Sequence, residues 1–257
     1  MLKLIGLGIH DEKDLSLRAI KEIKNSNKVF IELYTGKWSG NRENIEKITG
    51  KKIEILSRSD LEENSSKILD LAKERDVSIL SQGDPLVFTT HISLLSEANR
   101  LGIKTRIIHN SSIFSAVAET GLHLYKFGAS ATVPFQEKTK GRLPESVYDV
   151  IKQNKNLGLH TLLLLDIDKE NVMLPNNAIK IMLDVENLRK EKVFNADSKL
   201  IVLVNVGSEK SKMVYGKSSD LITKKFENLP SIIIVPGKLH FSEREFLESQ
   251  RGLKNLS

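Results

Sequence analysis

The chain has no cysteine among its 257 residues. This absence excludes a disulfide framework, a thiolate metal site and a cysteine nucleophile. Aromatic residues make up only 5% of the sequence, which disfavours the stacking platform that single-stranded nucleic acid requires. No stretch approaches the roughly 20 apolar residues that span a bilayer, and the first apolar run is too short for a secretory signal. We therefore expect a cytoplasmic protein that binds neither a membrane nor a nucleic acid.

What the chain does have is enough apolar sequence for a substantial core. Hydrophobic residues make up 40% of it, and the net charge is +6. The length allows one large domain or two modest ones. The lysines are scattered among acidic residues, which favours an ordinary solvated surface. A binding module without enzymatic activity, taking an acidic protein or a nucleic acid, remains an alternative because of the basic balance.

The first hundred residues alternate between predicted strands and helices. Asp14–Asn25 has apolar residues at helical spacing, with Asp14 as its expected N-cap. Short connections between strands and helices favour a mostly parallel sheet with helices on both faces. We therefore expect an α/β domain over residues 1–109. Its predicted strands are Leu2–Leu7, Lys28–Tyr34, Lys52–Leu56, Val77–Leu80 and Lys104–Ile108.

The second half has longer strands and fewer helices. The charged segment Ala178–Lys190 predicts a helix. We expect an α+β domain over residues 110–257. Its predicted strands are Ala129–Val133, Thr161–Leu165, Leu200–Val206 and Ile232–Val235.

A glycine turn, Gly6-Leu7-Gly8, ends the first predicted strand. A dinucleotide site would place a third glycine at position 11, where this chain has Asp11. An aspartate there would repel a pyrophosphate at a helix N-terminus. A cofactor without phosphate would not be repelled by this aspartate.

A second abrupt turn, Gly83-Asp84-Pro85, follows the predicted strand Val77–Leu80. Glycine permits unusual backbone angles, and proline biases Asp84 away from helix. Asp84 is thus expected at the carboxyl end of a strand, where open α/β sheets bind ligands. A plain turn with an Asx hydrogen bond is the structural alternative.

The histidines are widely spaced, and none forms a close pair at metal-ligand spacing on a helix. We therefore expect no metal centre, and no catalytic residue can be named from spacing. His91 can face the site or pack at a helix N-terminus. Lys126 can pair with a substrate carboxylate or be solvated.

The motifs and their order resemble the tetrapyrrole methylase fold family and, within it, the diphthine synthases. The first glycine turn is shared by the wider family, whereas the later motifs are typical of the narrower one. These motifs are Leu2–Asp11, Ser81–His91, His109–Gly128, Gly158–Asp166 and Ile234–His240. The resemblance covers nearly the whole chain.

This resemblance implies a methyltransferase of two α/β domains that uses S-adenosyl-L-methionine, bound in the interdomain cleft, and releases S-adenosyl-L-homocysteine. The implied substrate is translation elongation factor 2, at a histidine that carries a 3-carboxy-3-aminopropyl group in diphthamide biosynthesis. Family members are homodimers, so a homodimer is expected. The implied cofactor-binding positions are Ile9, Asp84, Val87, Ser112, Ile113, Leu165, Val206 and Ser231.

The resemblance leaves one alternative and one departure. The alternative is a methyltransferase of the same fold that acts on a tetrapyrrole, because such enzymes share the glycine turn and the Gly-Asp-Pro loop. The departure is Phe88, where related enzymes usually carry a small residue. A large ring beside Val87 narrows the expected pocket and puts its fine geometry in doubt.

Overall fold

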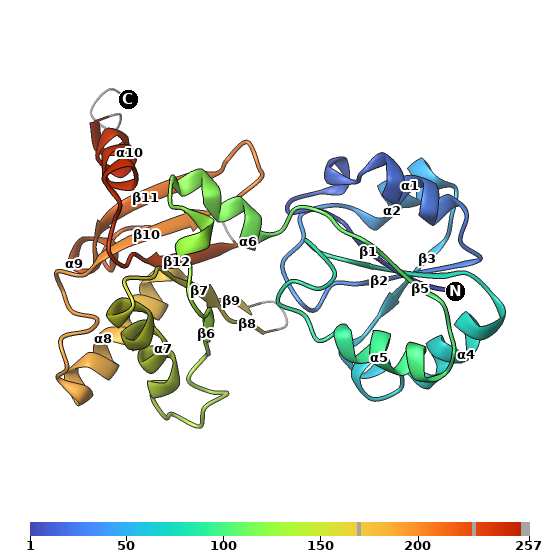
Figure 1. The fold of residues 1–257 in the computed structure, drawn as a ribbon, viewed down its shortest axis with the longest axis horizontal. Helices are drawn as coiled ribbons and strands as arrows, with labels where there is room; N and C mark the ends of the chain where they lie inside the picture. The colour runs from blue at the N-terminus through green and yellow to red at the C-terminus, as the bar shows by residue number, and fades with distance from the viewer. Residues whose placement is uncertain (169–170, 228–229, 253–257) are drawn as a thin grey trace. The chain divides into compact units, whose positions relative to one another are not determined.

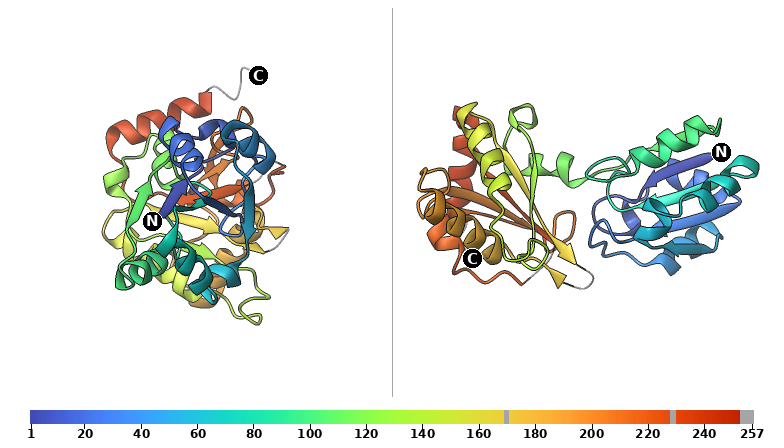
Figure 2. Two further views of the ribbon diagram at one scale, coloured as in Figure 1. Left: turned by 90° about the vertical axis from the view of Figure 1, so that its right-hand side faces the viewer. Right: turned by 90° about the horizontal axis from the view of Figure 1, so that it is seen from below.

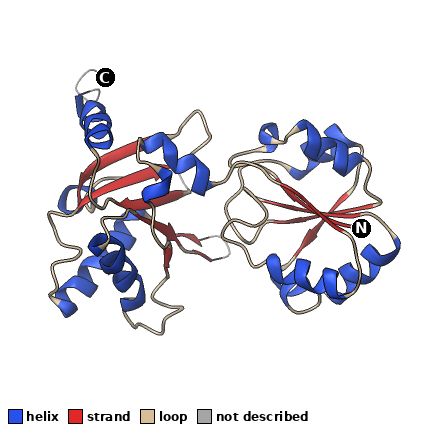
Figure 3. Cartoon of the chain, viewed as in Figure 1, coloured by secondary structure: helices blue, strands red, loops and turns tan. Residues whose placement is uncertain are grey.

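The computed structural model describes residues 1–168, 171–227 and 230–252. Its contacts divide the chain into two compact units, Met1–Ala116 and Val117–Ser257. Each unit has its own sheet and helices, as the colours of Figure 3 show. Among the described residues, none of the helices combines the length and the apolar character that a bilayer crossing requires.

The sheet of the first unit is parallel throughout its described part, in the order β3-β2-β4-β1-β5. Helices α1 and α2 lie on one face and α4 and α5 on the other (Figure 1, Figure 2). The predicted mostly parallel α/β sheet is confirmed. The bounds are β1 Leu2–Gly6, α1 Leu17–Lys24, β2 Lys28–Glu32, α2 Arg42–Thr49, β3 Ile53–Leu56, α3 Arg58–Glu62, α4 Ser66–Glu74, β4 Val77–Ser81, α5 Ile92–Arg100, β5 Thr105–Ile108 and α6 Ile113–Ala116.

Alternation along each strand divides the apolar core of this unit into two layers. Ile79 packs in the cluster under α4 and α5, and its neighbour Leu80 packs in the cluster under α1 and α2. Because both faces are covered, most strand positions are apolar, although Lys3 and Ser78 are buried within β1 and β4. Glu32 and Ser81 are the polar residues at the carboxyl ends of β2 and β4.

The start of α1 differs from the prediction. Ser16, not Asp14, is the N-cap, and its side chain accepts a hydrogen bond from the backbone N–H of Ala19. Asp14 ends a short 3₁₀ turn, Glu12–Asp14, and its carboxylate accepts a 2.7 Å hydrogen bond from the N–H of His10. Asp14 thus fixes the glycine turn rather than the helix.

The second unit is built on a mixed sheet in the order β11-β10-β12-β7-β6, antiparallel except for the pair β6 and β7. Helices α7 and α8 pack on one face through the larger apolar cluster, and Figure 1 shows α10 on the other side. The bounds are β6 Ala131–Val133, α7 Glu145–Asn156, β7 Thr161–Leu165, β8 Ile167–Asp168, β9 Asn171–Val172, α8 Pro175–Arg189, β10 Lys199–Val204, β11 Lys212–Lys217, α9 Ser218–Leu221, β12 Ser231–Val235 and α10 Phe241–Gly252.

Candidate functional site

The two glycine turns of the first unit lie directly against each other. The N–H of Gly83 donates to the carbonyl of Gly8 at 2.8 Å, and the N–H of Gly8 donates to the carbonyl of Gly83 at 3.2 Å. A Cβ at position 6 would lie 2.5 Å from the Gly83 carbonyl oxygen. This close approach of backbone to backbone is why the sequence has glycine at position 6.

Asp84 ties this edge to the segment that follows β5. Its Oδ2 accepts hydrogen bonds from His109 Nδ1 at 2.7 Å and from the N–H of Asn110 at 3.2 Å. Its Oδ1 accepts from the N–H of Leu86 at 3.0 Å, which is the Asx turn expected of an aspartate before proline. The carboxylate is 6% exposed. Asp84 therefore organises the loop, and both of its oxygens are already engaged.

Asn110 is a second organising residue, which the sequence analysis did not identify. Its side-chain amide donates to the carbonyls of Gly6 at 3.1 Å and Asp14 at 3.0 Å. The signal that could have pointed to it is its position directly after a strand, at the same sheet edge as Asp84. Three segments that are distant in sequence are thus joined by one carboxylate and one amide.

Five of the predicted cofactor-binding residues belong to these segments. Ile9 follows Gly8, and Asp84 and Val87 lie in the second turn. Ser112 begins the turn into α6, where its carbonyl accepts from the N–H of Ala116 at 2.9 Å, and Ile113 is the next residue. Ser112 also lies against Gly83, since a Cβ on that glycine would be 3.6 Å from Cβ of Ser112.

The other three predicted residues come together in the second unit. Ser231 pairs with Val204 of β10, and the register of β12 with β7 places it beside the end of β7, at Leu165. Val206 follows β10 on the same edge. All three are buried, and the hydroxyl of Ser231 has no hydrogen-bond partner among the described residues. A buried hydroxyl that no described residue bonds fits a site that receives a polar ligand.

A cluster of buried polar side chains lies next to the loop that contains Asp84. Glu32, at the end of β2, is fully buried, and its carboxylate accepts a 2.7 Å hydrogen bond from Thr35 Oγ1. Burial raises the pKa of Glu32, although hydrogen bonds from Thr35 and the nearby His91 oppose that change. Burial and the charges of Glu32 and Glu62 raise the pKa of Tyr34 to about 12.

His91 belongs to the same buried cluster and does not face an open site. It stands at the N-cap position of α5 without a capping bond, 3% exposed. Its Nδ1 lies 2.9 Å from the carbonyl of Pro85 and must carry the proton, because a carbonyl only accepts. Its Nε2 lies 3.8 Å from Glu32 Oε1. The sequence left two roles open for His91, facing the site or packing at a helix N-terminus. The structure shows the second, with a hydrogen bond from Nδ1 to the carbonyl of Pro85 that holds the Gly-Asp-Pro loop.

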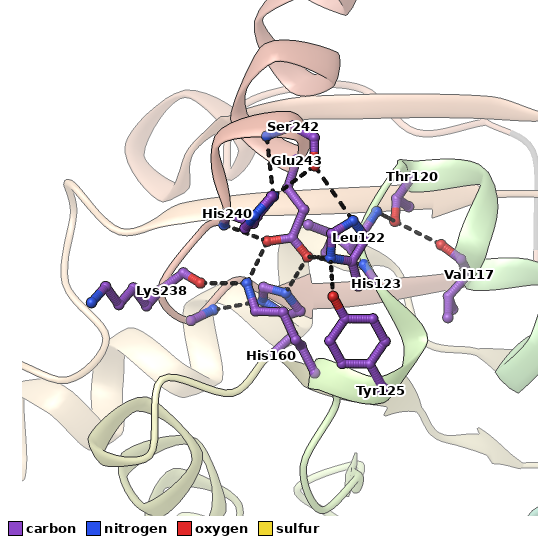
Figure 4. A network of polar contacts seen from close by, with 12 residues as sticks. Val117, Thr120, Leu122, His123, Tyr125, His160, Lys238, His240, Ser242 and Glu243 are labelled. Atoms are coloured by element: carbon purple, nitrogen blue, oxygen red, sulfur yellow. Dashed lines mark hydrogen bonds and ion pairs between the residues drawn. The ribbon is translucent and has the colours of Figure 1, made fainter.

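Glu243 of α10 is the centre of a polar cluster in the second unit (Figure 4). The carboxylate is fully buried and accepts from the backbone N–H groups of His123 at 2.9 Å and His240 at 2.7 Å. It also bonds Lys126 Nζ at 2.5 Å and His160 Nε2 at 3.1 Å. Lys126 is therefore paired with Glu243 rather than solvated.

The electrostatics of the Glu243 cluster are those of a satisfied buried charge. Burial acts to raise the pKa of Glu243, but the hydrogen bonds that it accepts outweigh burial and hold the pKa at about 2. Burial lowers the pKa of His160, in spite of its bond to Glu243. Among the described residues, no group of three or more acidic or histidine side chains has the arrangement of a metal site.

Comparison with known proteins identifies the family of this chain. The family model for Tetrapyrrole (Corrin/Porphyrin) Methylases matches residues 1–222. A diphthine synthase from Methanocaldococcus jannaschii is 45% identical, over 96% of this chain and 98% of that protein. One from Methanococcus aeolicus is 41% identical, over 96% and 97%. A crystal structure of diphthine synthase has a TM-score of 0.88 and 35% identity, and covers 96% of this chain and 94% of that one.

The sheet of unit 1, its opposed glycine turns and these matches define a methylase of the tetrapyrrole methylase fold. The chain belongs to that family and, within it, to the diphthine synthases, as the sequence resemblance predicted. It is therefore an enzyme, a methyltransferase of diphthamide biosynthesis.

Proposed function

We propose that the chain binds S-adenosyl-L-methionine through Ile9, Asp84, Val87, Ser112 and Ile113 of the first unit and Leu165, Val206 and Ser231 of the second. The observation that carries this proposal is the convergence of three loops at the carboxyl edge of β1, β4 and β5, organised by the Asp84 carboxylate. Ligands of open parallel sheets bind at that edge.

The residues at this edge fit a cofactor without phosphate. Asp11 places a partly exposed carboxylate shortly after the first glycine turn, which opposes a pyrophosphate and suits a cationic ligand. Aliphatic side chains at positions 9, 87 and 113 are partly exposed and can cover an adenine ring. In the second unit, the hydroxyl of Ser231, which has no partner among the described residues, offers a hydrogen bond beside the apolar Leu165.

When bound, S-adenosyl-L-methionine supplies a methyl group on a sulfonium that is already a good leaving group. The methyl group would pass from this sulfur to the substrate nitrogen, the proton of that nitrogen would go to solvent, and S-adenosyl-L-homocysteine would be the product. No covalent nucleophile is required of the chain, so its residues bind, orient and exclude water. Asp84 contributes by fixing the backbone of its own loop and of Asn110.

We further propose that the methyl acceptor is translation elongation factor 2, at the amino nitrogen of a histidine that carries a 3-carboxy-3-aminopropyl group. The relatives named diphthine synthase support this substrate. The nitrogen must be neutral to attack the methyl carbon, and partial desolvation favours that form. We propose that the enzyme works in the cytoplasm, where translation takes place, and as a homodimer.

The proposal is tested by titration calorimetry of the purified chain with S-adenosyl-L-homocysteine. We expect saturable binding with one site per chain. The matched variant is Asp84→Asn, which keeps one acceptor oxygen, compared with Asp84→Ala, which keeps none. Absence of binding by folded protein would overturn the cofactor assignment. Turnover of a precorrin without turnover of elongation factor 2 would instead support the tetrapyrrole alternative.

A further inference from the structure

Two exposed aromatic rings meet at the rim of the proposed cofactor site in the first unit. Phe88 follows Val87 and is 43% exposed, and Phe114 follows Ile113 and is 39% exposed. Their ring centroids are 5.9 Å apart, with an interplanar angle of 77°. In this edge-to-face arrangement the edge of one ring lies against the face of the other, and both residues remain partly exposed, so a ligand can reach them. The pair thus joins two loops that each carry proposed cofactor residues.

The backbone at Phe88 is strained. Its φ is +57°, in the left-handed region, which is unfavourable for a residue that has a Cβ. The loop imposes this conformation, since the carbonyl of Pro85 accepts from both Thr89 Oγ1 at 2.7 Å and His91 Nδ1 at 2.9 Å. The side chain remains 43% exposed and contacts the ring of Phe114. A strained residue that displays an apolar ring beside a binding loop points to a ligand contact.

The chemistry of the site indicates what such rings contact. The face of an aromatic ring attracts cations, and quaternary ammonium groups, which have no N–H to donate, are commonly held in this way. Within the described residues, the lysines and arginines that lie over aromatic rings do so at Phe30, Tyr34, Phe135 and Tyr148, not at this pair. Phe88 and Phe114 are therefore free to receive a cation from outside the chain.

We propose that Phe88 and Phe114 form an aromatic pair that binds a methylated onium group. This inference rests on the proposed function, which supplies two such cations. One is the sulfonium of S-adenosyl-L-methionine, and the other is the trimethylammonium that forms as the substrate nitrogen gains methyl groups. Phe88 and Phe114 are then specificity-determining residues, because they favour the charged donor or the more highly methylated substrate.

The test uses the full chain with Phe88→Leu and Phe114→Leu, which keep apolar bulk and remove the aromatic face. Phe88→Tyr keeps the ring and serves as the conservative variant. Leu101→Ala is the matched control, because Leu101 is 45% exposed in the same unit and outside the proposed site. Affinities for S-adenosyl-L-methionine and S-adenosyl-L-homocysteine are measured by calorimetry. Mass spectrometry counts the methyl groups placed on elongation factor 2 that carries the aminocarboxypropyl histidine.

If the pair binds the sulfonium, the leucine variants lose about two- to tenfold in affinity for the charged donor and keep their affinity for the neutral product. If it binds the ammonium, both affinities stay as in the wild type, and the leucine variants release elongation factor 2 with fewer methyl groups. In either case Phe88→Tyr behaves as the wild type.

Equal losses for donor and product, or wild-type affinities together with a wild-type methyl count, overturn the onium assignment and leave the methyltransferase function standing. A wild-type chain that binds neither adenosyl compound overturns the proposed function, and the onium assignment with it.

Discussion

Oδ2 of Asp84 and Nδ1 of His109 lie 2.7 Å apart, joining the end of β4 to the end of β5 across β1. The same oxygen accepts from the N–H of Asn110, and the other accepts from Leu86. His109 is 68% exposed at its side chain, whereas Asp84 is buried. The buried Asp84 therefore holds the loops together. The exposed His109 adds one contact to a loop arrangement that the backbone hydrogen bonds to Asp84 already fix.

Asp84→Ala should lower both stability and cofactor affinity. It leaves the N–H groups of Leu86 and Asn110 without their acceptor, at a cost of about 1–3 kcal/mol each where they stay desolvated. His109→Ala removes only an exposed contact and should change stability by less than about 1 kcal/mol. Urea denaturation and calorimetry with S-adenosyl-L-homocysteine check both variants. Full cofactor affinity combined with lower stability in Asp84→Ala would reduce Asp84 to a structural turn residue.

Gly6→Ala should displace the Gly-Asp-Pro loop. A Cβ there would lie 2.5 Å from the Gly83 carbonyl and 2.8 Å from Asn110 Cβ, so the free energy of unfolding should fall by about 1–3 kcal/mol. Gly50→Ala is the control, because position 50 has open space and only the strain of φ +69°. Gly6→Ala should also weaken adenosyl-ligand binding, and Gly50→Ala should not. Equal affinities in the two variants would contradict the role given to this contact.

Glu32→Gln should raise the free energy of unfolding at neutral pH. Burial raises the pKa of Glu32 in the folded chain. Such a carboxyl favours the folded state fully below its unfolded pKa of about 4.3 and loses that contribution as pH rises through the folded value. The gain should therefore vanish below about pH 4. Denaturation across pH 3.5–8 checks the trend, with exposed Glu63→Gln as control, and a loss of stability at pH 7 would contradict it.

The Glu243 cluster should make the second unit sensitive to acid. The pKa of Glu243 is held at about 2, so its contribution is complete above the unfolded value of about 4.3 and is lost as pH falls toward 2. The pKa of His160 is lowered by burial. Its unfolded form therefore takes up protons first, and stability should begin to fall below about pH 6.5.

Glu243→Gln tests this cluster directly. Removal of the charge leaves Lys126 without its partner and should cost about 3–5 kcal/mol at pH 7. Glu245→Gln is the control, because it makes the same change at an exposed position of α10. The difference between the two variants should shrink as pH approaches 2. A difference that does not change with pH would show that the charge of Glu243 is not what stabilises the cluster.

The local sequence predicts the first unit well, because its strands are short segments rich in apolar residues that alternate with helical patterns. It misses β11, Lys212–Lys217, whose residues are mostly half-exposed on an edge strand. It also places the start of α1 at Asp14. That error arises because the Asp14 carboxylate is used by His10, a contact within the glycine turn that helical spacing does not reveal.

The candidate site is predictable only where motifs are contiguous. The Gly-Asp-Pro run marks Asp84 because turn chemistry is local. Asn110 and Glu243 are not marked, since their roles depend on partners far away in sequence. Asn110 bonds Gly6 across 104 positions, and Glu243 bonds His123 across 120 positions. The assignment of the eight cofactor-binding residues stays a prediction.

Methyl transfer itself tests the central claim most directly. The purified chain is mixed with S-adenosyl-L-methionine labelled in its methyl group and with elongation factor 2 that carries the 3-carboxy-3-aminopropyl histidine. Unmodified elongation factor 2 and a precorrin serve as the two comparison substrates. We predict that label enters the modified factor alone, and more slowly with Asp84→Ala. Label in the precorrin alone, or in none of the three, would contradict the account.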